Sequence, residues 1–129
     1  MAFQSLPAPE GQAALAKMVM ALMDHWKLEP SDQAAVLGIL DDTHLTLAQY
    51  RRGEFSVSVS NDRFERIVHL LDIHQKLRLL FPQNLELAYL WMMTRNKAFG
   101  NLTPAQVIGG RGLVGLVVIR DYLEGSLYQ

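Results

Sequence analysis

Residues 91–129 read WMMTRNKAFGNLTPAQVIGGRGLVGLVVIRDYLEGSLYQ, and the boundary signals in this stretch indicate a succession of helices. Thr103 and Pro104 predict a helix start, because threonine is a good N-cap and a proline at the first helical position lacks only an amide that would have no partner there. The glycine pair at 109–110 predicts the end of this short helix.

The last helix is expected to begin after Gly112, over LVGLVVIRDYLE, and to end at Gly125. Its first half is rich in β-branched residues and also fits a buried strand. The apolar pattern continues through Tyr122 and Leu123, which is longer than a usual strand, and this length favours a helix.

The rest of the chain also carries helical patterns. Between residues 10 and 27 apolar residues recur at the spacing of one helix face and predict an amphipathic helix. Further helices are expected over residues 31–38, 44–52, 61–81 and 84–94, with caps at Ser31, Thr43, Asn61 and Asn84. Residues 55–60 alternate apolar and polar side chains, which is typical of a strand and equally of an extended connection along the core. We therefore expect a compact all-α protein of seven or eight helices.

The composition places the chain among globular proteins. It has 129 residues, of which 50% are hydrophobic and 19% charged, so it is long enough to bury a core as one domain or as two small helical parts. Cysteine is absent, which excludes disulfides and thiolate metal sites. No apolar run approaches the ~20 residues that span a bilayer, and the N-terminus lacks a signal-peptide pattern. We expect a soluble, cytoplasmic protein that does not bind a membrane.

The titratable residues form no pattern typical of an enzyme. The four histidines are scattered and lack the His-Glu-x-x-His spacing that places two metal ligands on one helical turn. Asp41, Asp42 and His44 are close in sequence, but carboxylates before a helix usually cap it. The glycines at 109–112 lack the strand and the Lys-Ser/Thr pair of a phosphate loop. We expect no catalytic residues, no metal and no cofactor.

Residues 47–53, LAQYRRG, are the best candidate for contact with nucleic acid. Short helices separated by a glycine suggest a helix-turn-helix, whose second helix enters the major groove, where glutamine pairs with adenine and arginine with guanine or phosphate. The alternative is a solvated helix end, because arginine there also complements the helix dipole. The formal charge of −1 supplies no overall attraction to DNA, and the pattern by itself leaves the two interpretations even.

The order of signals in the last third of the chain resembles one protein family. A helix, Asn-x-x-Phe-Gly, Thr-Pro, a short helix, a glycine break and a last helix are similar to the toxin-binding domain of the Xre/MbcA/ParS antitoxins, which neutralise toxins in bacterial toxin–antitoxin pairs. The residues that carry the resemblance are Trp91, Asn96, Phe99, Gly100, Thr103, Pro104 and Gly112. The family implies a non-enzymatic antitoxin that blocks the active site of a RES- or ParT-like toxin, which uses NAD. It also implies a homodimer with an Xre-like helix-turn-helix that binds operator DNA and represses its own operon.

This resemblance implies three parts: a flexible arm over 1–9, an Xre-like helix-turn-helix region over 10–82 and a helical toxin-binding domain over 83–129. DNA contacts are expected from Thr46, Gln49, Arg51 and Arg52. Toxin contacts are expected from Arg111, Arg120, Glu124, Leu127 and Tyr128. The last two lie beyond the expected helix end at Gly125, where apolar side chains have little reason to sit unless they dock on a partner.

Two further expectations concern assembly and function. A homodimer is expected because the helix over residues 10–27 is apolar over a wide face, and a chain of this length has limited core to cover it. The alternative function is a stand-alone helix-turn-helix transcription regulator, in which the C-terminal part only dimerises or senses a ligand.

Overall fold

The computed structural model describes residues 9–39, 47–54 and 61–128, and within these ranges the protein is all-α, as predicted. The only β-bridge in the described ranges, between Asn96 and Leu102, is isolated. The helices are α1 Pro9–His25, α2 Pro30–Leu37, α3 Leu47–Arg52, α4 Asn61–Leu80, α5 Leu85–Leu90, α6 Pro104–Arg111 and α7 Leu113–Leu127, with the short 3₁₀ helices η1 Trp91–Met93 and η2 Lys97–Phe99. The predicted strand over 55–60 and the predicted cap at Thr43 lie outside the described residues.

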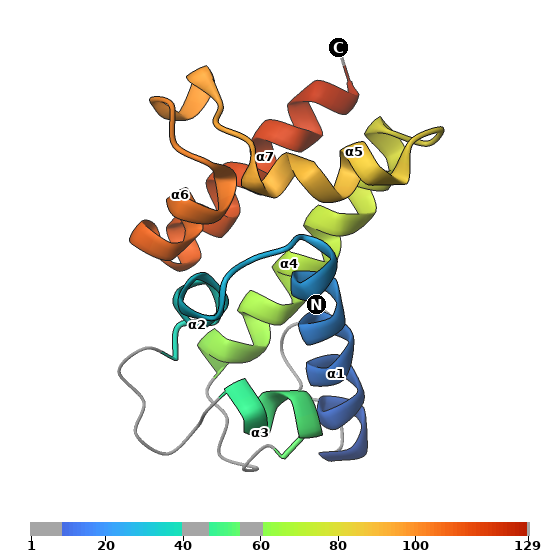
Figure 1. Ribbon diagram of the computed structural model, residues 1–129, viewed down its shortest axis with the longest axis vertical. Coiled ribbons are helices and arrows are strands. Elements are labelled where there is room, and N and C mark those ends of the chain that lie inside the picture. Colours follow the sequence, from blue (N-terminus) through green and yellow to red (C-terminus); the bar gives the residue numbers. More distant parts are fainter. Residues whose placement is uncertain (1–8, 40–46, 55–60, 129) are drawn as a thin grey trace.

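Helix α4 runs through the middle of the molecule and packs against helices from both halves of the chain (Figure 1). Helices α1 and α3 pack together at one end of the molecule, whereas α6 and α7 lie toward the other. Helix α2 contacts both α4 and α6 and so bridges the two groups. The N-terminal and C-terminal helices therefore share one core.

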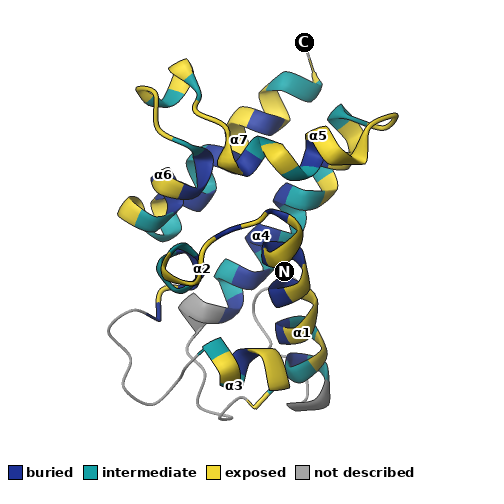
Figure 2. Cartoon of the chain, in the orientation of Figure 1, coloured by how far each residue is buried: buried dark blue, intermediate teal, exposed yellow. Residues whose placement is uncertain are grey.

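The core follows the length of α4 (Figure 2). Fully buried side chains occur along α4 at intervals of three and four residues, which places them on adjoining turns of the helix. They are Ile67, Leu70, Ile73 and Leu77. Helix α1 adds Met20 and Met23, Trp26 follows directly after α1, and α7 adds Leu116, Ile119 and Leu123. Most of the apolar face of α1 is thus covered inside the chain, and of its large apolar side chains only Met18 is exposed among the described residues. The covered part no longer supports the argument for a dimer.

The helix start predicted at Thr103 is confirmed. The Thr103 hydroxyl accepts the Gln106 N–H at 3.1 Å, and the Gln106 side-chain oxygen accepts the Thr103 N–H at 2.9 Å, which is a capping box. The predicted cap at Ser31 is wrong, because α2 begins one residue earlier, at Pro30, with Glu29 in the N-cap position. Proline takes the first helical position there because its φ is already set for a helix.

The helix ends predicted at the glycine pair 109–110 and at Gly125 are wrong. Helix α6 continues through the pair to Arg111 and ends at Gly112, whose φ of 63° and ψ of −134° favour glycine. Helix α7 continues past Gly125 to Leu127. A glycine ends a helix only where the chain takes a left-handed or related conformation, and Gly125 is not among the residues with positive φ.

Two glycines let the helices approach one another closely. A Cβ atom at Gly115 would lie 2.6 Å from the Val107 carbonyl oxygen and 2.9 Å from the Ile108 Cα. A Cβ atom at Gly109 would lie 3.2 Å from the Cβ of Ala35. Gly115 therefore sets the distance between α6 and α7, and Gly109 sets the distance between α6 and α2.

We predict that Gly115→Ala lowers the free energy of unfolding by about 1–3 kcal/mol, because the added methyl group must displace backbone atoms of α6. Urea denaturation followed by circular dichroism measures the change. Gly110→Ala is the matched control, since Gly110 is helical and no neighbouring atom lies within 4 Å of the position that an added methyl group would take. That change should raise the stability by about 0.5–1 kcal/mol. Equal effects of the two substitutions would contradict the close approach at Gly115.

Candidate functional site

Helix α7 buries one side and exposes a second, partly apolar side. Its buried residues are Gly115, Leu116, Ile119 and Leu123. On the opposite side, five residues follow one another at spacings of four, three, four and three, which places them on one line along the helix. These residues, which we call the α7 stripe, are Val114, Val118, Asp121, Gly125 and Tyr128. The stripe ends in the most exposed large apolar side chain of the described residues, since Tyr128 is 82% exposed.

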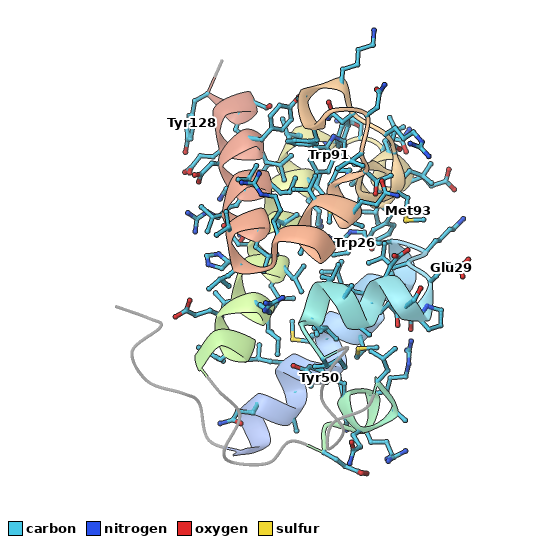
Figure 3. The ribbon with its side chains drawn as sticks, turned by 90° about the vertical axis from the view of Figure 1, so that its left-hand side faces the viewer. Trp26, Glu29, Tyr50, Trp91, Met93 and Tyr128 are labelled. Carbon is cyan, nitrogen blue, oxygen red and sulfur yellow. The ribbon has the colours of Figure 1, made fainter. Side chains whose placement is uncertain are left out.

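Four of the five residues predicted to contact a toxin lie together in the second half of α7. Arg120, Glu124 and Leu127 form a row beside the α7 stripe, and Tyr128 belongs to the stripe itself. Figure 3 shows Tyr128 at the outer edge of the molecule, at the end of α7. The fifth residue, Arg111, is exposed at the end of α6, beyond the opposite end of α7.

Arg120 is held against α4 by a buried histidine. Its Nη1 donates to the Nδ1 of His69 at 3.2 Å, and its Nη2 lies 3.3 Å from an oxygen of Asp121. Arginine only donates, so the Nδ1 of His69 carries the lone pair in this contact. Burial lowers the pKa of His69 from its ordinary value, and the charge of Arg120 lowers the pKa further. The neutral imidazole therefore fixes the guanidinium at the edge of the α7 row.

An aromatic cluster borders the other edge of the α7 stripe. Tyr122 stacks on Trp91, with ring centres 6.1 Å apart, and meets Phe99 edge-on at 5.0 Å. Trp91 and Phe99 also meet edge-on, at 6.3 Å. These contacts hold η1 and η2 against α7. Because Tyr122 remains 39% exposed, its ring extends the apolar surface next to the stripe.

The exposed residues Val114 and Tyr122 are not among the contacts predicted from the sequence. They belong to a long apolar pattern that fits a buried helix, although consecutive apolar residues on a helix point in all directions around its axis. A helix that is apolar on every side can bury all of them only when neighbours surround it. In a chain of this size, that excess of apolar residues was the signal for a docking surface.

Helix α3, which carries Gln49, Arg51 and Arg52 of the predicted DNA-contact residues, lies at the other end of the molecule (Figure 1). Arg51 bonds to Asp24 of α1 at 2.8 Å and to Gln33 of α2 at 3.1 Å, so its side chain ties three helices together. Its hydrogen bond to Asp24 holds the pKa of that carboxyl below its usual value. Arg52 pairs with Glu54 through its Nε and Nη2.

Both arginines of α3 are thus paired with acids, yet both side chains remain at the surface, 44% and 58% exposed. Gln49 is half-buried on the same helix. Thr46 lies outside the described residues. The structure therefore brings three of the four predicted residues together on one short helix, and the assignment of DNA contacts to them stays a prediction.

The described part of the chain shows no group of three or more histidine, aspartate and glutamate residues arranged to hold a metal ion. Among the helices of the same residues, none is long and apolar enough to cross a membrane.

Residues 76–126 match the family model described as the antitoxin Xre/MbcA/ParS C-terminal toxin-binding domain. The matched range begins in the last turns of α4 and ends in the last turn of α7, so it contains the aromatic cluster and nearly all of the α7 stripe. Neither the curated proteins nor the solved structures gave a significant match to the chain. The second part of the chain is therefore similar to a toxin-binding domain of antitoxins.

We predict that the free energy of unfolding falls between about pH 7 and about pH 5, and falls less in His69→Gln. The pKa of His69 is lowered in the folded protein, so protons bind the unfolded chain more readily. The stability from neutral His69 is therefore present above its unfolded pKa of about 6.5 and is lost as the pH falls through the folded pKa. Glutamine keeps an acceptor for Arg120 but does not titrate in this range.

Urea denaturation at a series of pH values measures both slopes. The pKa of His74 is also lowered by burial, so a smaller slope remains in the variant. The lowered pKa values of Asp24 and Glu54 act only in more acidic solution. Identical slopes for wild type and His69→Gln would show that the titration of His69 does not contribute to the loss of stability.

Proposed function

We propose that this protein is an antitoxin that covers a toxin with the α7 stripe and the adjoining row of Arg120, Glu124 and Leu127. The observation that carries the proposal is the match of residues 76–126 to a toxin-binding domain, because that range includes the helix with the exposed apolar side. Apolar residues aligned along one helix face are typical of a helix that docks into a groove. Arg120, Asp121 and Glu124 supply charges of both signs around them.

Leu127 and Tyr128 are held by a helix rather than by a loose tail, and this support favours binding to the toxin. Leu127 lies in the last turn of α7 and Tyr128 is its C-cap, so both are carried by a helix anchored through the buried Leu123. A side chain on such a rigid support loses less conformational entropy on binding than one on a loose tail. Tyrosine combines a large ring with a polar tip and is enriched among the residues that dominate binding energy. We propose that Tyr128 enters the toxin's active site.

We propose that the toxin is RES- or ParT-like and uses NAD. The antitoxin inhibits it by blocking access to the toxin's active site. This finer assignment rests on the order of motifs from Trp91 to Gly112, which resembles the antitoxins of such toxins. The chain is divided in this proposal into an arm over 1–9, a helix-turn-helix region over 10–82 and a toxin-binding part over 83–129. We also propose that α3 binds operator DNA, so that the antitoxin represses its own operon in the cytoplasm. Helix α3 lies at the end of the molecule away from the end of α7, so the two partners do not compete for one surface (Figure 1).

We predict that Tyr128→Ala weakens toxin binding by about 2 kcal/mol, roughly thirtyfold, as expected for an interface hot spot. Isothermal titration with the purified toxin measures the dissociation constant. Met18→Ala is the control, because Met18 is 54% exposed but lies on α1. Gly125→Ala gives a second test, since no described atom beyond the adjoining residues and the backbone of α7 lies within 4 Å of the added methyl group. That variant should be more stable by about 0.5–1 kcal/mol and yet bind the toxin less tightly. Unchanged affinity for the toxin in both variants would show that the toxin does not bind the α7 stripe.

For DNA, we predict that Arg51→Ala with Arg52→Ala weakens promoter binding by about 1–3 kcal/mol per lost base contact, or flattens its salt dependence if the arginines contact phosphates. The affinity for the toxin should not change in this double variant. Asp24→Asn is the matched variant, because it removes the acid that holds Arg51 and leaves the arginine in place. Electrophoretic mobility shifts over a range of salt should show promoter binding that is retained or strengthened in Asp24→Asn. A wild-type protein that fails to shift its promoter at low salt would refute operator binding.

A further inference from the structure

The segment between α5 and α6 that carries the Asn-x-x-Phe-Gly motif projects at the same end of the molecule as the end of α7 (Figure 1). We call residues 95–102 of this segment the motif loop. Most of its residues are exposed to solvent (Figure 2). A loop that buries so little of itself cannot take its shape from the core, so its conformation depends on hydrogen bonds of its own.

Hydrogen bonds from one side chain and its backbone fix the motif loop. The Asn96 carbonyl accepts the N–H groups of Phe99 and Asn101, each at 3.0 Å. The Asn96 side-chain oxygen accepts the Ala98 N–H at 2.9 Å. The Asn96 N–H donates to the Leu102 carbonyl at 3.0 Å and closes the loop. The motif loop is therefore ordered before any partner arrives, and an ordered loop loses little conformational entropy on binding.

Aromatic contacts attach the motif loop to the helix that we propose for the toxin. The Phe99 ring meets Tyr122 of α7 at 5.0 Å and Trp91 of η1 at 6.3 Å, both edge-on. Tyr122 borders the α7 stripe, so the motif loop adjoins the stripe at that edge. Lys97 belongs to the same short helix, η2, as Phe99. A partner that covers the stripe therefore meets the motif loop as the next part of the surface.

The charges in this part of the chain have one sign. Residues 87–120 contain four basic residues and no acidic residue, although the whole chain has a formal charge of −1. The basic residues are Arg95, Lys97, Arg111 and Arg120. Arg95 and Lys97 are exposed on the motif loop, and neither forms an ion pair with another described residue. Arg95 donates only to the Asn101 carbonyl, at 3.1 Å, so both positive charges stay available to a partner.

The other edge of the α7 stripe carries the opposite charge. There Arg120 lies 3.3 Å from Asp121, and the two charges offset one another. Glu124 is exposed and forms no ion pair with another described residue. The apolar stripe therefore lies between a positive edge at the motif loop and a negative edge at Glu124. Charges arranged in this way admit a complementary partner in one orientation and oppose the reversed one.

We propose that the motif loop is a second contact with the toxin and that it binds an acidic surface beside the toxin's active site. This inference rests on the proposed function, because the partner is the toxin that the α7 stripe covers. Exposed charges at the rim of an interface mainly speed association, since attraction between opposite charges steers the two proteins together. The apolar stripe holds the complex, whereas Arg95 and Lys97 set how fast it forms and in which orientation.

Association rates measured by stopped flow with the purified toxin test the inference. Lys97→Glu should lower the association rate constant about tenfold at low salt, and Lys97→Gln should give a rate between those of wild type and Lys97→Glu. The difference should shrink as salt is added, because salt screens exposed charges. Lys17→Glu is the matched control, because it makes the same change of charge at an exposed lysine of α1 and should associate as the wild type does. Circular dichroism and thermal melting should show that all three variants are folded.

The outcomes separate the motif loop from the α7 stripe. Equal association rates for Lys97→Glu and Lys17→Glu would overturn the loop contact, and weaker toxin binding by Tyr128→Ala would leave the proposed function standing. A wild-type protein that does not bind the toxin would overturn both. A Lys97→Glu variant that associates normally with the toxin but no longer shifts promoter DNA would assign the motif loop to nucleic acid and overturn the inference.

Discussion

The packing of α7 against the central helix α4 is the interaction on which the rest of the structure depends. Helix α4 is long enough to receive the apolar sides of α1 and α7 at once, and its four fully buried residues lie where these helices meet. Burying a leucine or isoleucine side chain stabilises the fold by roughly 1.5–3 kcal/mol. Because α7 uses only one side for this contact, its opposite side stays at the surface. The same packing that anchors the C-terminal helix therefore also presents its stripe.

Much of the fold could be predicted from the sequence, where the signals were local. The start of α6 at Thr103 follows from hydrogen bonds within four residues, so the capping motif could be recognised without the rest of the chain. The helix ends predicted at Gly109 and Gly110 and at Gly125 failed because glycine ends a helix only where the chain takes a positive φ, and none of these three residues does so. The residue type permits that conformation but does not require it. Gly112 differs because it combines a glycine with a conformation that other residues avoid.

Part of the candidate sites could also be predicted, because the spacing of residues along one helix is a local signal. The row of Arg120, Glu124 and Leu127 follows from helical spacing, and the structure places these residues together. The partner of Arg51 could not be foreseen, because Asp24 is 27 positions away and meets it only through the packing of α3 on α1. The exposure of α5 was also hidden in the sequence. Leu87 and Leu90 have the spacing of core residues, and only the three-dimensional arrangement shows that both are exposed.

The N-terminal helices and the start of α7 are connected by one side chain, Arg66 of α4. Its guanidinium donates to the Val36 carbonyl at 3.3 Å and lies 2.6 Å from the position of a Cβ atom at Gly38, at the end of α2. It also lies 3.0 Å from that position at Gly112, where α6 gives way to α7. A larger residue at either glycine would displace the same guanidinium. The end of α2 and the start of α7 thus pack against the same guanidinium. Arg66 therefore joins the packing of the N-terminal helices to that of α7.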